Sequence, residues 1–179
     1  MEKGPDSAFP DDLTESFEPV IGTAVTLRPL RPEDRDIESA FVHGLSAETR
    51  HNRLLGGAIA ITREYIERLV NVDYSRDMAL AATTMLEDKE TLIGVTRYVL
   101  DKNKPSAEFA IVVADAWQGR GIGKRVLAKL IDIARRRGVK QLYGEILATN
   151  RPMLEMVRRL GFRLERHADA TLVRAVMDV

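Results

Sequence analysis

The sequence predicts an α/β domain built on a mixed sheet. Its 179 residues, of which 45% are hydrophobic, are enough for one compact core. Strand-like alternation and helical spacing follow one another in the order strand, helices, three-strand meander, helix, strand, helix, strands. A turn that contains three glycines joins the last strand of the meander to the most regular helix. Together these observations place helices against a sheet that combines parallel and antiparallel neighbours.

The first 22 residues differ in composition from the rest of the chain. They hold six acidic residues and one lysine, a net charge of −5, which leaves about +5 on the remainder because the whole chain is neutral. Prolines interrupt the segment, and it shows little periodicity. We therefore expect residues 1–22 to be a disordered or loosely docked acidic extension, and residues 23–179 to form the domain.

Helices dominate the segment that follows a first short strand. Residues 24–28 alternate as a strand does, and two prolines then separate them from an acid-rich helix start at residue 33. Ser46 and Thr62 are N-cap residues, each with an acid two positions later, and they predict further helices that end near Leu55 and Val70.

Three strands come next. Residues 78–86 and 92–100 are apolar and β-branched, and the polar stretch between them predicts an antiparallel hairpin. Residues 108–113 alternate, with Phe109, Ile111 and Val113 on one face and Glu108 on the other, as in a central strand.

The last third alternates between helices and strands. An apolar stripe from Val126 to Ala134, ended by Gly138, predicts an amphipathic helix, and residues 139–147 predict a strand. A second helix begins at Pro152 and ends before Gly161. Short strands at residues 162–165 and 171–177 complete the chain.

Several functional classes are excluded by composition. The chain has no cysteine, so disulfides, thiolate metal sites and a cysteine nucleophile are excluded, and its three histidines lack metal-ligand spacing. No apolar run approaches the roughly 20 residues of a membrane span, and no secretion signal is visible. Three arginines at residues 135–137 end a helix, where cations complement the helix dipole. We expect a cytoplasmic protein that binds no metal, membrane or nucleic acid.

The glycine turn carries the chemistry. It has the pattern Gln-x-x-Gly-x-Gly, and it consists of Gln118, Gly119, Arg120, Gly121, Ile122, Gly123 and Lys124. Alternating glycines let backbone N–H groups converge on a ligand, and the positive end of a helix dipole adds to their attraction for a pyrophosphate. A Walker loop would need glycine at Gln118, and a Rossmann loop starting at Gly121 would need glycine at Val126. The pattern Gln-x-x-Gly-x-Gly, preceded by a strand and opening a helix, is instead similar to the known acyl-CoA signature, so we expect acyl-CoA binding.

With this turn the chain resembles the GNAT acetyltransferase superfamily over roughly residues 24–177. A second motif of that family is an asparagine followed by a helix and Gly-Phe, and here it matches Asn150 and Gly161-Phe162. The resemblance implies the GNAT fold, an α/β (α+β) fold with a mixed, mostly antiparallel sheet of six to seven strands and about four helices. It also implies acetyl-CoA as cosubstrate, in a groove where the strand after the turn's helix splays from the strand before it.

The resemblance also assigns cofactor contacts. It implies that the backbone of Ile111, Val112 and Val113 holds the pantetheine, that Gln118 to Lys124 hold the pyrophosphate, and that Asn150 contacts the pantetheine arm. More narrowly, four segments resemble the catalytic domain of bacterial protein lysine acetyltransferases (Pat type), which acetylate acyl-CoA synthetases: residues 43–50, 73–80, 107–110 and 115–118.

Transfer to an amine needs a base, because a lysine ammonium with a reference pKa of about 10.4 is almost wholly charged at neutral pH. Glu108 is the candidate, since it lies a few residues before the turn and off the Phe109 face, and Glu145 is the reserve. The tyrosine acid of many relatives is replaced by Val157, which leaves Tyr74 and Tyr143 as alternative donors. A structural role for Glu108 in a surface salt bridge stays open at this point.

These observations predict an N-acetyltransferase whose partners are acetyl-CoA and an amine acceptor. The preferred acceptor is a protein lysine, for which an acyl-CoA synthetase is one candidate. Two alternatives remain: a small amine such as a polyamine-like metabolite, and a catalytically silent acyl-CoA sensing domain. Homodimer formation is left open by the sequence.

Overall fold

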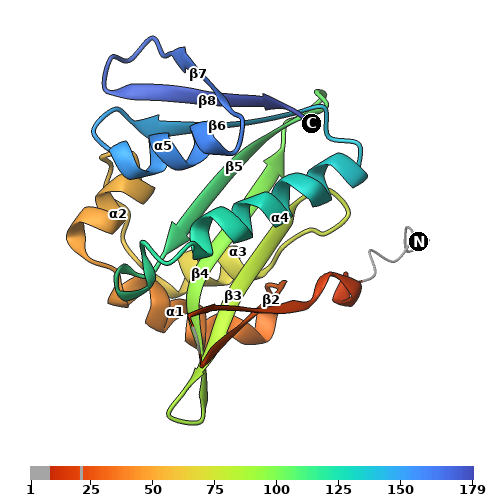
Figure 1. Cartoon of the computed structure of the whole chain (residues 1–179), viewed down its shortest axis with the longest axis vertical. Helices are drawn as coiled ribbons and strands as arrows, with labels where there is room; N and C mark the ends of the chain where they lie inside the picture. The colour runs from red at the N-terminus through yellow and green to blue at the C-terminus, as the bar shows by residue number, and fades with distance from the viewer. Residues whose placement is uncertain (1–8, 21) are drawn as a thin grey trace.

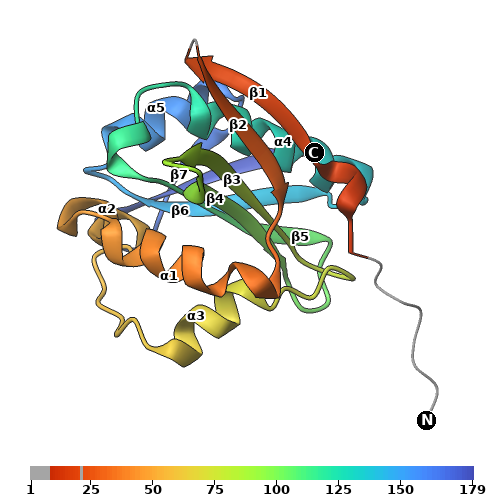
Figure 2. The ribbon, with the colours of Figure 1, turned by 90° about the horizontal axis from the view of Figure 1, so that it is seen from below.

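A computed structural model describes residues 9–20 and 22–179 of the chain. In these residues eight strands form one sheet in the order β1-β2-β3-β4-β5-β6-β8-β7, and only β5 and β6 are parallel neighbours. Helices cover both faces: α4 and α5 lie on one, and α1, α2 and α3 lie on the other (Figures 1 and 2). The predicted mixed, mostly antiparallel α/β fold is confirmed, with one strand and one α-helix more than expected.

The N-terminal half contains the elements Asp11–Leu13 (η1), Glu15–Val20 (β1), Thr23–Pro29 (β2), Pro32–Asp34 (η2), Arg35–Gly44 (α1), Ala47–Arg53 (α2), Arg63–Val70 (α3), Met78–Leu86 (β3) and Lys89–Leu100 (β4). The second half contains Ser106–Val113 (β5), Asp115–Trp117 (η3), Ile122–Arg136 (α4), Gln141–Leu147 (β6), Arg151–Arg159 (α5), Arg163–Arg166 (β7) and Leu172–Asp178 (β8).

The two predicted helix N-caps and the predicted hairpin are found at the expected positions. The Ser46 hydroxyl accepts a hydrogen bond from Thr49 N at 3.1 Å, and the Thr62 hydroxyl accepts one from Tyr65 N at 3.1 Å, so both predicted N-caps are confirmed. The β3–β4 hairpin turns through Glu87 and Asp88, whose φ angles of 48° and 61° are those of a tight two-residue turn. This turn is shorter than predicted because β4 already begins at Lys89.

The fold begins before Thr23, which corrects the expected disordered or loosely docked extension. Strand β1 pairs with β2, and Glu15 on β1 forms salt bridges with Lys129 at 2.6 Å and Arg125 at 3.7 Å on α4. Phe9 packs edge-on against Tyr74, with 5.5 Å between ring centroids. Part of the acidic segment is therefore held by the basic body of the protein. Residues 1–8 and 21 lie outside the described part of the chain.

Two apolar cores fill the spaces between the sheet and its helices. The larger core joins α4 and α5 to the sheet and includes Val126, Leu127, Leu130 and Val157, none of which is more than 1% exposed. The smaller core lies under α1 and α3. Burial of these side chains is the main stabilising contribution to the fold, at about 25 cal/mol per Å² of apolar surface.

The aromatic side chain of Phe109 sets the spacing between β5 and β6. Its ring lies over Gly144, where an added Cβ would be 2.7 Å from Phe109 Cε1 and 2.9 Å from Cζ. The ring also packs against Phe162, with 4.9 Å between centroids, so it has little room to move. Glycine at position 144 is thus required by packing.

We predict that Gly144→Ala lowers the free energy of unfolding by about 1–3 kcal/mol, because the new methyl group overpacks the core. Gly44→Ala is the matched control, since Gly44 is helical and an added Cβ meets no atom within 4 Å. Urea unfolding followed by circular dichroism measures both changes. Equal stabilities for the two variants would contradict this account of Phe109.

Candidate active site

Strands β5 and β6 separate soon after they meet. Their parallel pairing covers three positions in the described chain, from Ser106↔Gln141 to Glu108↔Tyr143, and Figure 1 shows the strands diverging beyond it. The splayed strands that the sequence resemblance implied are therefore present. From about Phe109 onward, this edge of β5 therefore has no strand partner in the part of the chain that the structure describes.

The alternation of β5 decides which groups face this gap. Ser106 O accepts from Asp101 N and Ala114 N donates to Ile93 O, so the main chain of the even-numbered residues points toward β4. The N–H and C=O groups of Ile111 and Val113 therefore point toward the gap. The main chain of Val112 faces β4 instead, which removes it from the expected backbone contacts with a ligand in the gap.

The glycine turn follows β5 directly and opens helix α4. Gly119 and Gly121 have φ angles of 72° and 80°, in the left-handed region that glycine adopts without strain. Gly121 is the N-cap of α4 and has no side chain with which to cap it, so the N–H groups of Ile122, Gly123 and Lys124 begin the helix without intrahelical partners. Such a helix start attracts anions through its N–H groups and its dipole.

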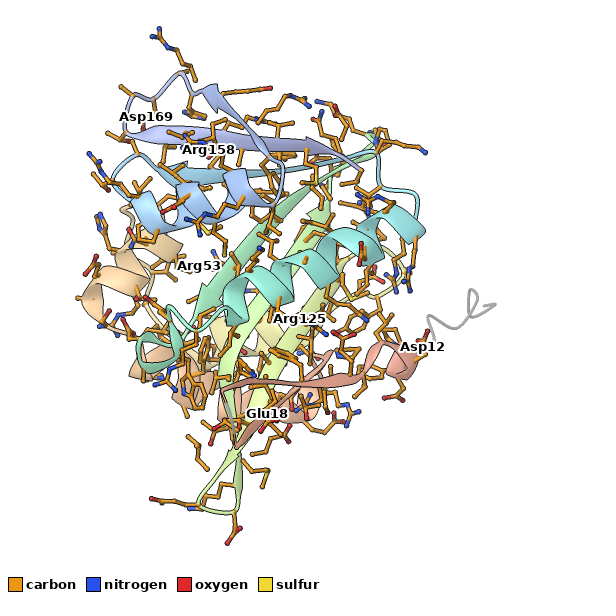
Figure 3. All side chains as sticks on the ribbon, in the orientation of Figure 1. Asp12, Glu18, Arg53, Arg125, Arg158 and Asp169 are labelled. Atoms are coloured by element: carbon orange, nitrogen blue, oxygen red, sulfur yellow. The ribbon has the colours of Figure 1, made fainter. Side chains whose placement is uncertain are left out.

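Gly123 permits a close approach between three elements. An added Cβ would lie 3.3 Å from Met156 Sδ on α5 and 3.5 Å from Val113 Cγ2 on β5. Three cations accompany the turn: Arg120, which stacks on the Trp117 ring at 5.0 Å, Lys124, and Arg125. Arg125 lies on the side of α4 that faces β1, where it approaches Glu15 (Figure 3). The turn therefore combines exposed donors with positive charge, as a pyrophosphate requires.

Gln118 holds the turn in place through its side chain. Its amide Nε2 donates to Val113 O at 3.0 Å and to Thr49 Oγ1 at 3.2 Å. Asp115 adds to this link, since its carboxylate accepts from Ser46 N at 2.9 Å, Ser46 Oγ at 2.6 Å and Thr49 Oγ1 at 2.7 Å. These hydrogen bonds lower the pKa of Asp115. The turn is thereby fixed to the start of α2, a contact that sequence spacing did not predict.

Glu108 lies on the face of β5 opposite Phe109, and its side chain keeps contact with solvent. Its register partner on β6 is Tyr143, so Glu145 stands two residues farther along the same face. Partial burial raises the pKa of Glu108, and the charge of Glu145 raises it further, while Arg53 opposes the shift. A carboxylate with a raised pKa beside a groove is suited to accept a proton.

The other sequence candidates have structural partners. Tyr74 donates to Leu30 O at 2.6 Å and is buried, and burial raises its pKa well above the usual range. Tyr143 donates to Asp101 at 2.8 Å, and burial raises its pKa to about 12. Glu145 Oε1 lies 3.2 Å from His167 Nε2. Each of the two tyrosine hydroxyl groups therefore already donates to a structural partner.

Asn150 lies at the far side of the gap, at the start of α5. Its Oδ1 accepts from Met153 N at 3.3 Å, so the side chain caps this helix. Val157 is fully buried on the same helix and offers no acid to a ligand.

None of the helices in the described residues is long and apolar enough to cross a membrane.

Comparison with known proteins agrees with this geometry. The sequence pattern of the acetyltransferase (GNAT) family matches residues 37–162. Acetyltransferase PA5475 of Pseudomonas aeruginosa is 36% identical over 148 residues, which cover 83% of this chain and 80% of that protein. Acetyltransferase Pat of Mycolicibacterium smegmatis is 32% identical over 154 residues, covering 86% of this chain and 45% of that protein.

A solved structure shares the fold. The GNAT domain of S. lividans PAT superimposes with a TM-score of 0.83 at 23% identity, and the match covers 96% of this chain and 99% of that domain. The similarity extends through the strands on either side of the gap.

Proposed function

Because the chain belongs to the GNAT family of acetyltransferases, we propose that it transfers an acetyl group from acetyl-CoA to a protein lysine, with Glu108 as the base. The observation that carries this proposal is the position of Glu108 on β5. This strand leads into the glycine turn and borders the gap toward β6. A single strand can therefore place acetyl-CoA, the acetyl donor, beside Glu108, the proposed base.

The cofactor contacts follow from the main chain. The N–H groups at the start of α4, from Ile122 to Lys124, bind the pyrophosphate, with Arg120 and Lys124 nearby. The N–H and C=O groups of Ile111 and the N–H of Val113 bind the pantetheine arm as an added strand would, and Asn150 borders its far side. Gln118 positions the turn through Val113 O and Thr49.

The transfer itself needs one proton movement before attack. Glu108 takes one proton from the acceptor ammonium, and the free amine attacks the acetyl carbon. When the tetrahedral intermediate collapses, the thioester C–S bond breaks, the amide forms, and the second proton of the nitrogen is released to solvent. A backbone N–H at the edge of β5 stabilises the oxyanion. Coenzyme A leaves as a thiolate with a reference pKa near 8.5, so Val157 in place of a tyrosine acid does not prevent departure.

A protein acceptor is supported by the solvent contact of Glu108 and by the likeness to enzymes named Pat. The test incubates the protein and acetyl-CoA with an acyl-CoA synthetase, spermidine or free lysine, followed by mass spectrometry. Acetylated lysine on the synthetase supports the proposal. Acetylated spermidine or free lysine favours a small amine as acceptor. CoA binding in calorimetry without any product favours a silent sensing domain, and no binding contradicts the cofactor assignment.

The raised pKa of Glu108 predicts the shape of the pH profile. We expect log(kcat/KM) to rise with a slope of about 1 below that pKa, where Glu108 must lose its proton, and to level off above it, where Glu108 is ionised and the amine still binds as its ammonium form. Glu145→Gln removes a neighbouring charge that raises the pKa, so the change of slope moves to lower pH. Initial rates from pH 4 to 8, roughly the range around a raised carboxyl pKa, measure it. An unmoved break in the Glu145→Gln profile would contradict the coupling.

A further inference from the structure

A pocket opens on the face of the sheet that carries Glu108, under helices α1, α2 and α3. Apolar side chains form most of its wall, among them Phe41, Leu45 and Leu54, and Ala110 and Val112 form part of its floor. These last two are the next residues along β5 on the side of Glu108. A chemical group attached to either reacting partner at Glu108 can therefore extend into the pocket.

The charges around this pocket are unbalanced. Arg50 and Arg53 on α2 and Arg97 on β4 line it, against one carboxyl group, that of Glu38 on α1. Among the described residues, none of these three arginines forms a salt bridge. Arg97 Nη1 donates to Leu69 O at 3.2 Å, and its strand partner on β5 is Ala110. In the view of Figure 3, Arg53 lies between α2 and α4.

Besides the three arginines, the pocket contains the buried carboxyl group of Glu38. Its side chain is buried, with the residue 2% exposed, and Oε2 has no hydrogen-bond partner among the described residues. Burial raises the pKa of Glu38, against the opposing charges of Arg97 and Arg53. A buried polar atom without a partner is destabilising, so a ligand that supplies the partner is favoured.

We propose that this pocket binds a carboxylate at the end of a short aliphatic chain, attached to one of the two reacting groups. The methylenes contact the apolar wall, Arg97 and Arg53 pair with the carboxylate, and Glu38 in its protonated form donates a hydrogen bond to it. A cationic group would instead leave three guanidinium groups facing it. The inference rests on the proposed function, because that function places the reacting groups beside Glu108.

The carboxylate has two chemical sources, and the experiment separates them. On the donor side, calorimetry compares S-(3-carboxypropyl)-CoA with S-butyl-CoA, two stable thioethers of similar length. On the acceptor side, kcat/KM with acetyl-CoA compares 6-aminohexanoate with hexylamine. We expect the carboxylate form to be preferred at least about 10-fold on one side, as for a hydrogen bond to a charged group. The side that shows the preference identifies the source.

We expect Arg97→Met to remove the preference for the carboxylate form. We expect Arg53→Gln to reduce this preference, and because Arg53 lies on α2 this variant leaves the sheet unaltered. Arg136→Gln, at the exposed C-terminal end of α4, makes the same change in net charge and leaves the preference intact. Equal values within both pairs of compounds, or a preference that survives Arg97→Met in folded protein, would overturn the proposal. Failure of both thioethers to bind would contradict the proposed function instead.

Discussion

Glu108→Gln lowers kcat for acetyl transfer by about 10²- to 10⁴-fold, the range typical for loss of a general base. The amide keeps the size of the side chain but cannot accept the proton of an ammonium group. The cofactor contacts proposed here come from main-chain groups of β5 and α4, so the affinity for CoA stays nearly unchanged. Steady-state kinetics with saturating acetyl-CoA, together with calorimetry on CoA, measure the two quantities separately.

The control for this variant is Glu87→Gln at the exposed turn of the β3–β4 hairpin, which projects away from the site (Figure 1). It makes the same chemical change and leaves kcat unaffected. Glu145→Gln distinguishes the reserve base: if Glu145 is the base, its variant and not Glu108→Gln shows the large loss. A kcat for Glu108→Gln within a few-fold of the unmodified enzyme removes Glu108 from the mechanism.

Asp34→Ala lowers the free energy of unfolding by about 3–5 kcal/mol, because it leaves a buried guanidinium without its main partner. Asp34 accepts two hydrogen bonds from Arg28, at 2.7 and 2.8 Å, and both side chains are less than a tenth exposed. The Asp34 hydrogen bond is the largest cause of the raised pKa of Arg28. Asp34 Oδ2 also accepts from Arg31 N at 2.8 Å, so the pair fixes the chain between β2 and α1.

The partner on the other side of Arg28 provides the control. Glu90 also bonds Arg28, at 3.0 Å, but its side chain is 45% exposed. Glu90→Ala therefore costs at most about 1 kcal/mol, since water replaces the lost contact. Urea unfolding at neutral pH compares the two variants, and similar losses for both would show that burial of the pair contributes little.

Local patterns predicted most of the fold. The stripe of α4 and the β-branched runs of β3 and β4 are long and regular, and the glycine turn joins two well-defined elements, so their positions were predictable. Strand β1 was missed because prolines break its pattern and its Glu15 partner, Lys129, is distant in the sequence. Its stability comes from tertiary contacts, which periodicity does not report.

In the site, too, residues in local motifs were predictable from the sequence, and contacts between distant residues were not. The turn and Glu108 were candidates because each belongs to a local motif. The Asp115 network and the facing charges of Glu38 and Arg97 join residues far apart in the chain. One signal was available: Arg97 is a lone charge within an apolar strand, and such a residue needs a partner or a ligand.

Strand β5 presents two different surfaces. Its odd-numbered residues direct peptide groups toward the gap, while Ala110 and Val112 direct side chains toward the pocket. Under the proposed function, the carrier thioester is held by atoms that every amino acid shares, and the choice of substrate depends on atoms that differ between amino acids. Mutations on the second surface can therefore change which substrates the enzyme accepts while its affinity for coenzyme A stays the same.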